Sequence, residues 1–87
     1  MKSETHFKNG KKDGVEGIWS SKGVKKSEIH YKNGKKDGVE KRWDKKGRKK
    51  SLKHYKSGIE NGIRKVWDRD GKMVYQGNFV DGSEEMK

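Results

Sequence analysis

The sequence contains no cysteine, few hydrophobic residues and no long apolar run. Without cysteine, neither a disulfide framework nor a thiolate metal site can form. Hydrophobic residues make up only 25% of the 87 residues, so we expect one domain at most, without a large core. No apolar segment approaches the ~18–20 residues that span a membrane, and the N-terminal MKSETHFKNG lacks the apolar stretch of a signal peptide. These absences favour a soluble, cytoplasmic protein.

Acidic residues are scarce beside basic ones, 13 against 24, which gives a formal net charge of +11. Low hydrophobicity with high net charge is typical of disordered chains. Repetition argues against disorder here, because the stretch FKNGKKDGVEGIWS from Phe7 returns as YKNGKKDGVEKRWD from Tyr31 and, more loosely, as YKSGIENGIRKVWD from Tyr55. Disordered segments seldom keep tryptophans in strict register, and three stand 24 residues apart: Trp19, Trp43 and Trp67.

The period divides the single domain, residues 1–87, into units. They cover 7–30, 31–54 and 55–78, a partial fourth covers 79–82, and we expect the tail 83–87 to fray. Repeats of this length indicate a small supersecondary unit stacked on its neighbours.

Each unit reads as two short strands bounded by glycines. β-formers such as Val39 and Ile29 favour strands, and glycines at fixed offsets disfavour helices. Asn33-Gly34 is a hairpin-turn dipeptide, and Asp44-Lys45-Lys46-Gly47 has the Asp-first, Gly-fourth pattern of a type I turn. Tight turns at both strand ends predict an all-β, elongated antiparallel meander of six or seven strands.

The motif K-N-G-K-K-D-G, followed by a short strand, a Trp and a D-x-x-G turn, resembles the MORN repeat, in particular the bacterial variant of YwqK-family antitoxins. The resemblance covers about Phe7 to Gly82 and implies a single-layer antiparallel sheet. It also implies a scaffold or a protein- or lipid-contacting module, with an antitoxin role at the family level. The third unit departs from the motif, because Ile59-Glu60 replaces the two lysines. If the lysine loop is the working part, unit three has lost it.

The candidates for catalysis or metal binding are His6, His30 and His54, which are equivalent in the repeat. Equivalent residues of a meander lie two strands apart, about 9–10 Å. Zinc binds imidazole nitrogens at about 2.0–2.1 Å, so the three cannot share one ion, and we interpret them as strand-face histidines. The aspartates before turn glycines, such as Asp37, are favoured there by the local backbone conformation, so they do not indicate an active site. We predict a non-enzyme with no catalytic residue, metal or cofactor.

The basic excess is central. Unit two has 11 basic and 3 acidic residues, a net of +8, whereas units one and three have nets of +3 and +2. The excess is either a solvated surface that guards sheet edges or a site for an acidic partner, which could be a protein, RNA or DNA, or anionic lipid. The predicted basic patch consists of Lys35, Lys36, Lys41, Arg42, Lys45, Lys46, Arg48, Lys49, Lys50 and Lys53.

The aromatic residues permit two interpretations: a platform on which nucleic-acid bases stack, or the core stripe of the sheet. In a single layer no helix or second sheet can cover them, and exposed apolar strips usually mark an interface. We therefore expect an aromatic face that contacts a partner or a second copy in a homodimer, formed by Trp19, Tyr31, Trp43, Tyr55 and Trp67.

The leading hypothesis is a non-catalytic protein that docks on a toxin or other nucleic-acid-acting effector and inhibits it. Buried aromatics anchor such an interface, whereas charge raises the association rate. A basic protein cannot mimic nucleic acid, so it must bind an acidic surface of the target or the target's RNA or DNA. The alternative is non-specific RNA or DNA binding through the basic patch. Attachment to anionic membranes ranks last, because no amphipathic helix or lipidation motif is present.

Overall fold

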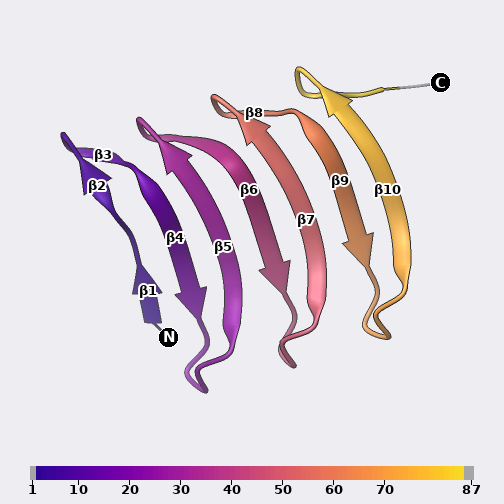
Figure 1. The fold of residues 1–87 in the computed structure, drawn as a ribbon. Coiled ribbons are helices and arrows are strands. Elements are labelled where there is room, and N and C mark those ends of the chain that lie inside the picture. Colours follow the sequence, from indigo (N-terminus) through magenta and orange to yellow (C-terminus); the bar gives the residue numbers. More distant parts are fainter. Residues whose placement is uncertain (1, 86–87) are drawn as a thin grey trace.

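In the computed structural model, which describes residues 2–85, the chain is all β and forms a thin elongated sheet (Figure 1), with extents of 41 × 32 × 10 Å. The predicted fold class is therefore confirmed. The strands of the described part are β1 (Lys2–Glu4), β2 (Phe7–Lys8), β3 (Lys11–Lys12), β4 (Gly14–Trp19), β5 (Lys25–Lys32), β6 (Lys35–Trp43), β7 (Lys49–Lys56), β8 (Ile59–Glu60), β9 (Gly62–Trp67), β10 (Met73–Val80) and β11 (Ser83–Glu84).

The strands form an antiparallel meander. The main sheet has the order β1-β4-β5-β6-β7-β9-β10-β11, with β8 paired to β7 and β2 paired to β3. The short segments are parts of longer strands interrupted near a repeated glycine. In the middle unit this glycine, Gly38, has a φ of 104° and lies in a bulge, because β6 has three residues between Lys36 and Glu40 where β5 has only His30. The interruption bends each unit at the same place.

Two kinds of turn close the hairpins, as the sequence predicts. Asn33 and Gly34 both have positive φ, 52° and 82°, the conformation of a two-residue hairpin turn. At the other end of the strands, the amide of Gly47 donates to the carbonyl of Asp44 at 3.0 Å. The Asp44 carboxylate also accepts hydrogen bonds from the amides of Lys46 and Arg48, at 2.9 and 3.0 Å.

Hydrogen bonds from the two-residue turns tie each unit to the one before it. The amide of Gly34 donates to the carbonyl of Lys12 at 2.9 Å, and Gly58 donates in the same way to Lys36 at 2.8 Å. Gly82 repeats the contact with the carbonyl of Glu60 at 2.8 Å. Each turn therefore completes the preceding unit as well as closing its own hairpin.

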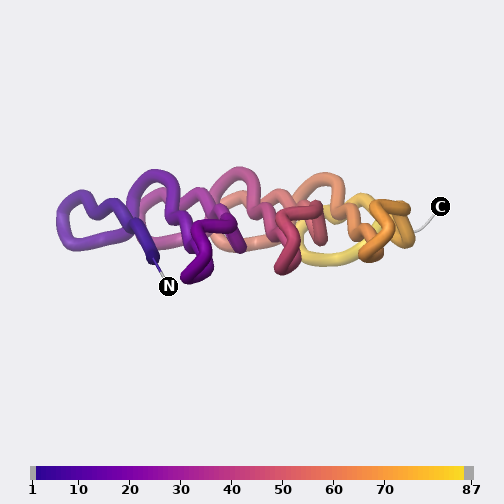
Figure 2. The backbone as a smooth tube through the Cα atoms, turned by 90° about the horizontal axis from the view of Figure 1, so that it is seen from below, coloured from indigo at the N-terminus to yellow at the C-terminus, as the bar shows by residue number. Residues whose placement is uncertain are grey.

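The sheet has almost no core. Within the described residues only Ile29 and Phe79 are buried hydrophobic side chains, and they are accompanied by the buried polar residues Ser27 and Glu40. Figure 2 shows the backbone as a single layer, without a second sheet or a helix against it in residues 2–85. Stability must therefore come largely from contacts between neighbouring strands.

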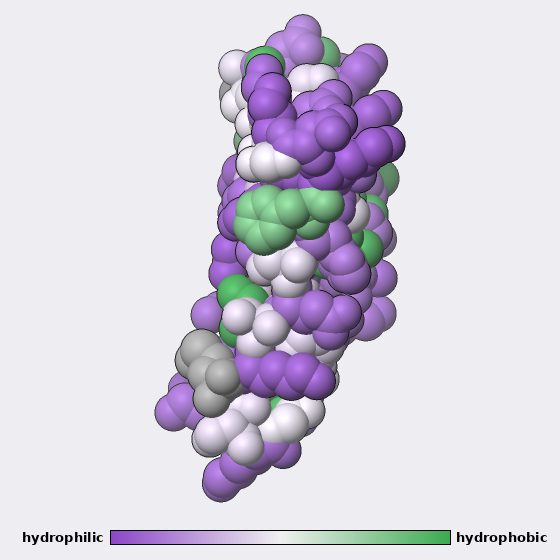
Figure 3. All heavy atoms as spheres, turned by 90° about the vertical axis from the view of Figure 1, so that its left-hand side faces the viewer, coloured by the Kyte–Doolittle hydropathy of each residue, from purple (hydrophilic) through white to green (hydrophobic). Residues whose placement is uncertain are grey.

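The N-terminal edge of the sheet is largely polar (Figure 3), whereas β10 near the C-terminal edge exposes Met73, Val74 and Val80. Figure 3 views the N-terminal edge, where hydrophilic residues cover most of the surface and hydrophobic ones form separate patches. Charged residues at a sheet edge discourage pairing with other chains. At the C-terminal end, part of the tail that we expected to fray forms β11, in which Ser83 pairs with Val80 and Glu84 with Phe79. Residues 86 and 87 of the tail lie outside the described residues.

Candidate functional site

The five aromatic residues predicted to share one face lie on opposite faces. Tyr31 is two residues from Ile29, which pairs with Glu40, whereas Trp43 is an odd number of residues from Glu40. Side chains alternate along a strand, so Tyr31 and Trp43 point to opposite sides. The expectation of a single aromatic face was wrong. Across a hairpin with a two-residue turn, paired residues share a face and their numbers differ by an odd number. The aromatic residues are 12 apart, an even number, so successive ones point to opposite faces. The Trp face carries Trp19, Trp43 and Trp67, and the Tyr face carries Tyr31 and Tyr55.

On the Tyr face, each tyrosine packs with an ion pair from the preceding strand. The Nζ atom of Lys36 is 2.8 Å from a carboxylate oxygen of Glu40 and 4.9 Å from the centre of the Tyr55 ring. In unit one, Lys12 makes the same two contacts, at 3.1 Å with Glu16 and 4.8 Å with the Tyr31 ring. The lysine charge is thus shared between a carboxylate and an aromatic ring.

Unit three keeps this ion pair with its polarity reversed. Glu60 stands at the position of Lys36, and Arg64 stands at the position of Glu40. The Nε atom of Arg64 donates to Glu60 at 2.8 Å, and its guanidinium lies 4.1 Å from the centre of the Phe79 ring. The second lysine of each dilysine is therefore part of a structural ion pair, and unit three conserves the pair instead of losing a binding loop.

Glu40 is the most buried side chain of the described sheet, with 1% of its surface exposed. Its two carboxylate oxygens accept hydrogen bonds from Lys36 Nζ and Arg42 Nε, both at 2.8 Å. Burial alone would raise the pKa of the Glu40 carboxyl, but the hydrogen bonds and charges of Lys36 and Arg42 outweigh burial and hold the pKa below its ordinary value of 4.5. At the centre of the Tyr face, the carboxylate is therefore balanced by the two cations that bind it.

On the Trp face, the space between Trp19 and Trp43 is bridged by a lysine. Lys25 Nζ lies 5.4 Å from the Trp19 ring centre and 5.8 Å from the Trp43 ring centre. Glu28 forms an ion pair with Lys25, and this hydrogen bond lowers the pKa of the Glu28 carboxyl against the opposing effect of burial. His30 lies on the other side of the same carboxylate, with Nε2 at 3.5 Å. We call this space the Trp19–Trp43 gap.

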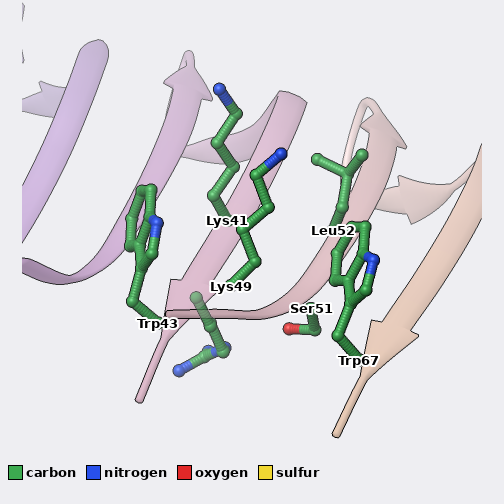
Figure 4. A pocket seen from close by; sticks show the side chains of 7 residues that line it. Lys41, Trp43, Lys49, Ser51, Leu52 and Trp67 are labelled. Carbon is green, nitrogen blue, oxygen red and sulfur yellow. The ribbon is translucent and has the colours of Figure 1, made fainter. Parts of the chain in front are cut away.

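The next space along the sheet, the Trp43–Trp67 gap, is open. It forms a hollow of about 240 Å³, with Leu52 at the position that Glu28 has one unit earlier. Figure 4 shows Trp43 and Trp67 on its two sides, with Lys41 and Lys49 between them. Lys49 Nζ is 5.7 Å from the Trp67 ring centre. Among the described residues, neither lysine forms a salt bridge.

Three residues of the predicted basic patch are held by carboxylates. Lys36 and Arg42 both bind Glu40, and Arg48 Nε binds Asp44 at 2.9 Å. These cations serve the fold, and their charge is largely compensated.

The other seven residues of the patch are spread over the sheet. Lys41 and Lys49 line the Trp43–Trp67 gap, whereas Lys53 pairs with Glu40 across the strands and so lies on the Tyr face. The residues of the predicted patch are therefore divided between both faces and both turn edges of the sheet. The residues near the turns are Lys35, Lys45, Lys46 and Lys50.

Two of the three histidines lie on strands as expected, whereas His6 lies between β1 and β2. His30 and His54 are on β5 and β7, with β6 between them, and His54 Nδ1 is 2.8 Å from the carbonyl oxygen of Ile63. Within residues 2–85, no three His, Asp or Glu side chains come together as a metal site would need. That part of the chain also has no helix long and apolar enough to cross a bilayer.

The residues that distinguish the two gaps, Glu28 and Leu52, are not evident as site residues from the sequence alone, nor is the lysine that Glu28 holds, Lys25. A signal was present, because the position is Glu28, Leu52 and Gln76 in successive units while the tryptophan never changes. The significance of that variation becomes apparent only from the strand register, which places this position beside the tryptophans.

A comparison with known families matches residues 60–81 to the family described as a MORN repeat variant. The 24-residue period places equivalent segments at 36–57 and 12–33. No curated protein and no solved structure matches the chain significantly. The chain therefore carries a MORN repeat variant over residues 60–81, within an all-β repeat sheet, and a repeat of this kind suggests a binding role.

Proposed function

We propose that this chain is a non-catalytic binding protein that docks through its Trp face on an acidic protein surface and inhibits its partner. The partner class that fits best is a toxin or effector acting on nucleic acid, so the chain would serve as an antitoxin or immunity-type inhibitor. One observation carries the proposal: the Trp face combines half-buried tryptophans with lysines that form no salt bridge among the described residues, at the Trp43–Trp67 gap.

The difference between the two faces supports this choice of surface. The Tyr face has its central cations bound by Glu16 and Glu40 and its tyrosines covered by those same cations. Apart from Lys53, the charges at the centre of this face are already paired, so it gains less from a charged partner. The Trp face offers large indole groups together with lysines outside any salt bridge among the described residues, and such aromatics dominate interface energies when a partner buries them.

The sign of the charge limits how inhibition can work. A toxin that acts on nucleic acid needs a basic substrate groove, and a protein of net charge +11 is repelled from it. The chain must bind an acidic region beside or away from that groove, and block the partner sterically or hold it in an inactive conformation. Opposite charges would then accelerate association, whereas the tryptophans would slow dissociation.

Two double charge reversals test the surface. The first, Lys41→Glu with Lys49→Glu, alters the Trp face, and its matched control, Lys45→Glu with Lys46→Glu, alters an exposed turn. Both change the net charge equally. In nuclease-treated extract of the producing cell, we expect the tagged chain to capture one stoichiometric protein. The first variant should lose that protein, and the control should keep it.

The same variants test inhibition. The activity of the captured protein should fall when the purified chain is added and should not fall with the Trp-face variant. Equal capture by both variants would contradict the choice of face, and a partner whose activity is unaffected would contradict inhibition.

Nucleic-acid binding is the second candidate, because lysines alternate with tryptophans along the Trp face and bases stack on aromatic rings. Salt distinguishes the two functions. Contacts with about six phosphates would make log affinity fall steeply with log salt, whereas a tryptophan-anchored protein interface weakens much less. If nuclease removes everything that the chain captures, the second candidate replaces the first.

A further inference from the structure

We propose that the Trp43–Trp67 gap is the specificity pocket of the Trp face, and that it takes one apolar side chain from an acidic segment of the partner protein. This inference rests on the proposed function, since it names the chemistry of the partner. It follows from a comparison of two equivalent gaps in the same chain, of which one is closed and the other open.

The Trp19–Trp43 gap shows how such a space is closed from within. Lys25 reaches both indole rings, within 6 Å of each ring centre, and Glu28 holds its ammonium group in that place. The cation covers the ring faces, and the carboxylate neutralises the cation. Little apolar surface or charge remains there for a ligand.

The Trp43–Trp67 gap lacks the group that performs this closure. Leu52 replaces Glu28, so Lys49, the equivalent of Lys25, has no carboxylate to hold it across the gap. Among the described residues Lys49 contacts the Trp67 ring but makes no cation–π contact with Trp43. Leu52 instead adds apolar surface to the lining of the hollow.

The width of the gap suits a single side chain. The tryptophans come from strands two steps apart, or about 9–10 Å. An apolar group in contact with both sides needs about 7–8 Å between them. A leucine, isoleucine or phenylalanine fits this space, and burial between two indoles and Leu52 removes its surface from water. A polar side chain would lose hydrogen bonds to water without a replacement.

The charges around the gap define what flanks that side chain. Lys41 and Lys49 stand at the hollow and form no salt bridge among the described residues. Lys41 has Glu28 as a cross-strand neighbour on one side and Leu52 on the other, so its compensation is one-sided. Carboxylates beside the inserted side chain would take the role that Glu28 plays for Lys25. The occupant is therefore an apolar residue flanked by Asp or Glu.

The test uses two fluorescein-labelled peptides and the full chain. One peptide carries a leucine flanked on each side by acidic residues, and its twin has serine in place of the leucine. Binding is measured by fluorescence anisotropy at low and physiological salt. We expect the leucine peptide to bind about tenfold more tightly than the serine peptide. The ratio should persist at both salt concentrations, because salt screens the shared charges and leaves apolar burial intact.

Each of two substitutions gives one gap the residue found in the other. Leu52→Glu supplies the missing carboxylate, so we expect Lys49 to close the gap and the preference for leucine over serine to disappear. Reading the ratio of the two peptides removes the general repulsion that an added acid exerts on both. Glu28→Leu should release Lys25 and open the Trp19–Trp43 gap, so that the chain binds a second leucine peptide. This gain cannot arise from unfolding, which circular dichroism checks for both variants.

Equal binding of the two peptides to the unchanged chain would overturn the proposal, as would an unchanged preference in Leu52→Glu. If Leu52→Glu fails to fold, the absence of a second site in Glu28→Leu overturns it. Oligothymidylate that binds in a Leu52-dependent manner, without a leucine preference among peptides, would make the gap a base-stacking site.

The pocket and the proposed function can fail separately. Loss of the peptide preference, with protein capture still dependent on Lys41 and Lys49, would refute only the pocket. A clear preference without any captured protein would refute only the inhibitor.

Discussion

At the scale of single residues, the centre of the sheet depends on one carboxylate. Glu40 is buried, and both of its oxygens are occupied by cations, one of which also lies over the Tyr55 ring. The equivalent residues Glu16 and Arg64 each pair with one oppositely charged residue: Lys12 binds Glu16, and Arg64 binds Glu60 through two hydrogen bonds. Unit two therefore concentrates more ionic stabilisation at this position than its neighbours do.

We predict that Glu40→Gln lowers the free energy of unfolding by about 1–3 kcal/mol, because Lys36 and Arg42 lose their shared charged partner. Urea denaturation followed by circular dichroism measures the change. The matched control gives unit two the three residues that unit three has at these positions: Lys36→Glu with Glu40→Arg and Arg42→Val, which avoids two adjacent arginines, should be more stable than Glu40→Gln. A control as unstable as the single variant would mean that the pair is not interchangeable.

Acid should destabilise the sheet through its paired carboxyls. Burial raises the pKa of Glu16 but its hydrogen bonds from Lys12 and Thr5 prevail, and the pKa values of Glu16, Glu28 and Glu40 all lie below the ordinary 4.5. A lowered folded-state pKa stabilises the fold above the unfolded value, and that stability is lost as pH falls through the folded pKa. The urea midpoint should therefore hold from pH 7 to about 5 and drop below about 4.5. A midpoint that is unchanged at pH 3 would contradict this.

At the scale of elements, the D-x-x-G turns differ in how well they are capped. Asp44 and Asp68 accept hydrogen bonds from two backbone amides at 2.9–3.0 Å, whereas Ser20 accepts the equivalent ones at 3.2 and 3.3 Å. A carboxylate is the stronger acceptor. The first turn is therefore the least well closed of the three.

We predict that Ser20→Asp stabilises the chain by about 0.5–1 kcal/mol. The urea midpoint should rise at pH 7. At a pH where the new carboxyl is protonated, most of this gain should be absent. A neutral or destabilising effect at pH 7 would show that the serine already suffices.

The repeated bulge is the element that bends each unit. A side chain at Gly38 would have to adopt a φ of 104°, which L-residues rarely tolerate, and its Cβ would lie 3.3 Å from the Cβ of His30. Gly38→Ala should cost about 1–3 kcal/mol in denaturation experiments. Gly47→Asn is the control, because its φ of 80° is closer to the left-handed region that Asn accepts, and it should cost less.

At the scale of the whole molecule, positive charge opposes a compact sheet. Because basic residues are in excess, repulsion between like charges outweighs the attraction within ion pairs. Sodium chloride screens both, so it should raise the melting temperature at pH 7. The variant Lys45→Glu with Lys46→Glu has less excess charge and should respond less. A melting temperature that falls with added salt would mean that ion pairs dominate stability.

The fold followed from the sequence, whereas the site did so only in part. Glycine spacing and the Asn33-Gly34 and Asp44–Gly47 turns determine a meander, because these conformations depend on local backbone preferences. Which side chains share a face depends on the parity of each turn and bulge, and Tyr31 and Trp43 were assigned wrongly for that reason. The role of Lys36 was hidden as well, because a lysine that pairs with a buried carboxylate looks the same in a sequence as one facing solvent.

The amide hydrogen bond from each two-residue turn to the preceding unit has a consequence for how the gene can change. An in-frame duplication of residues 31–54 would copy a donor, Gly34, together with an acceptor, Lys36, so the new unit could join both neighbours without other mutations. Such an event would lengthen the sheet by two strands, or about 10 Å. It would also supply a second copy of Leu52, and hence a second copy of the proposed pocket on which selection could act while the original remained unchanged.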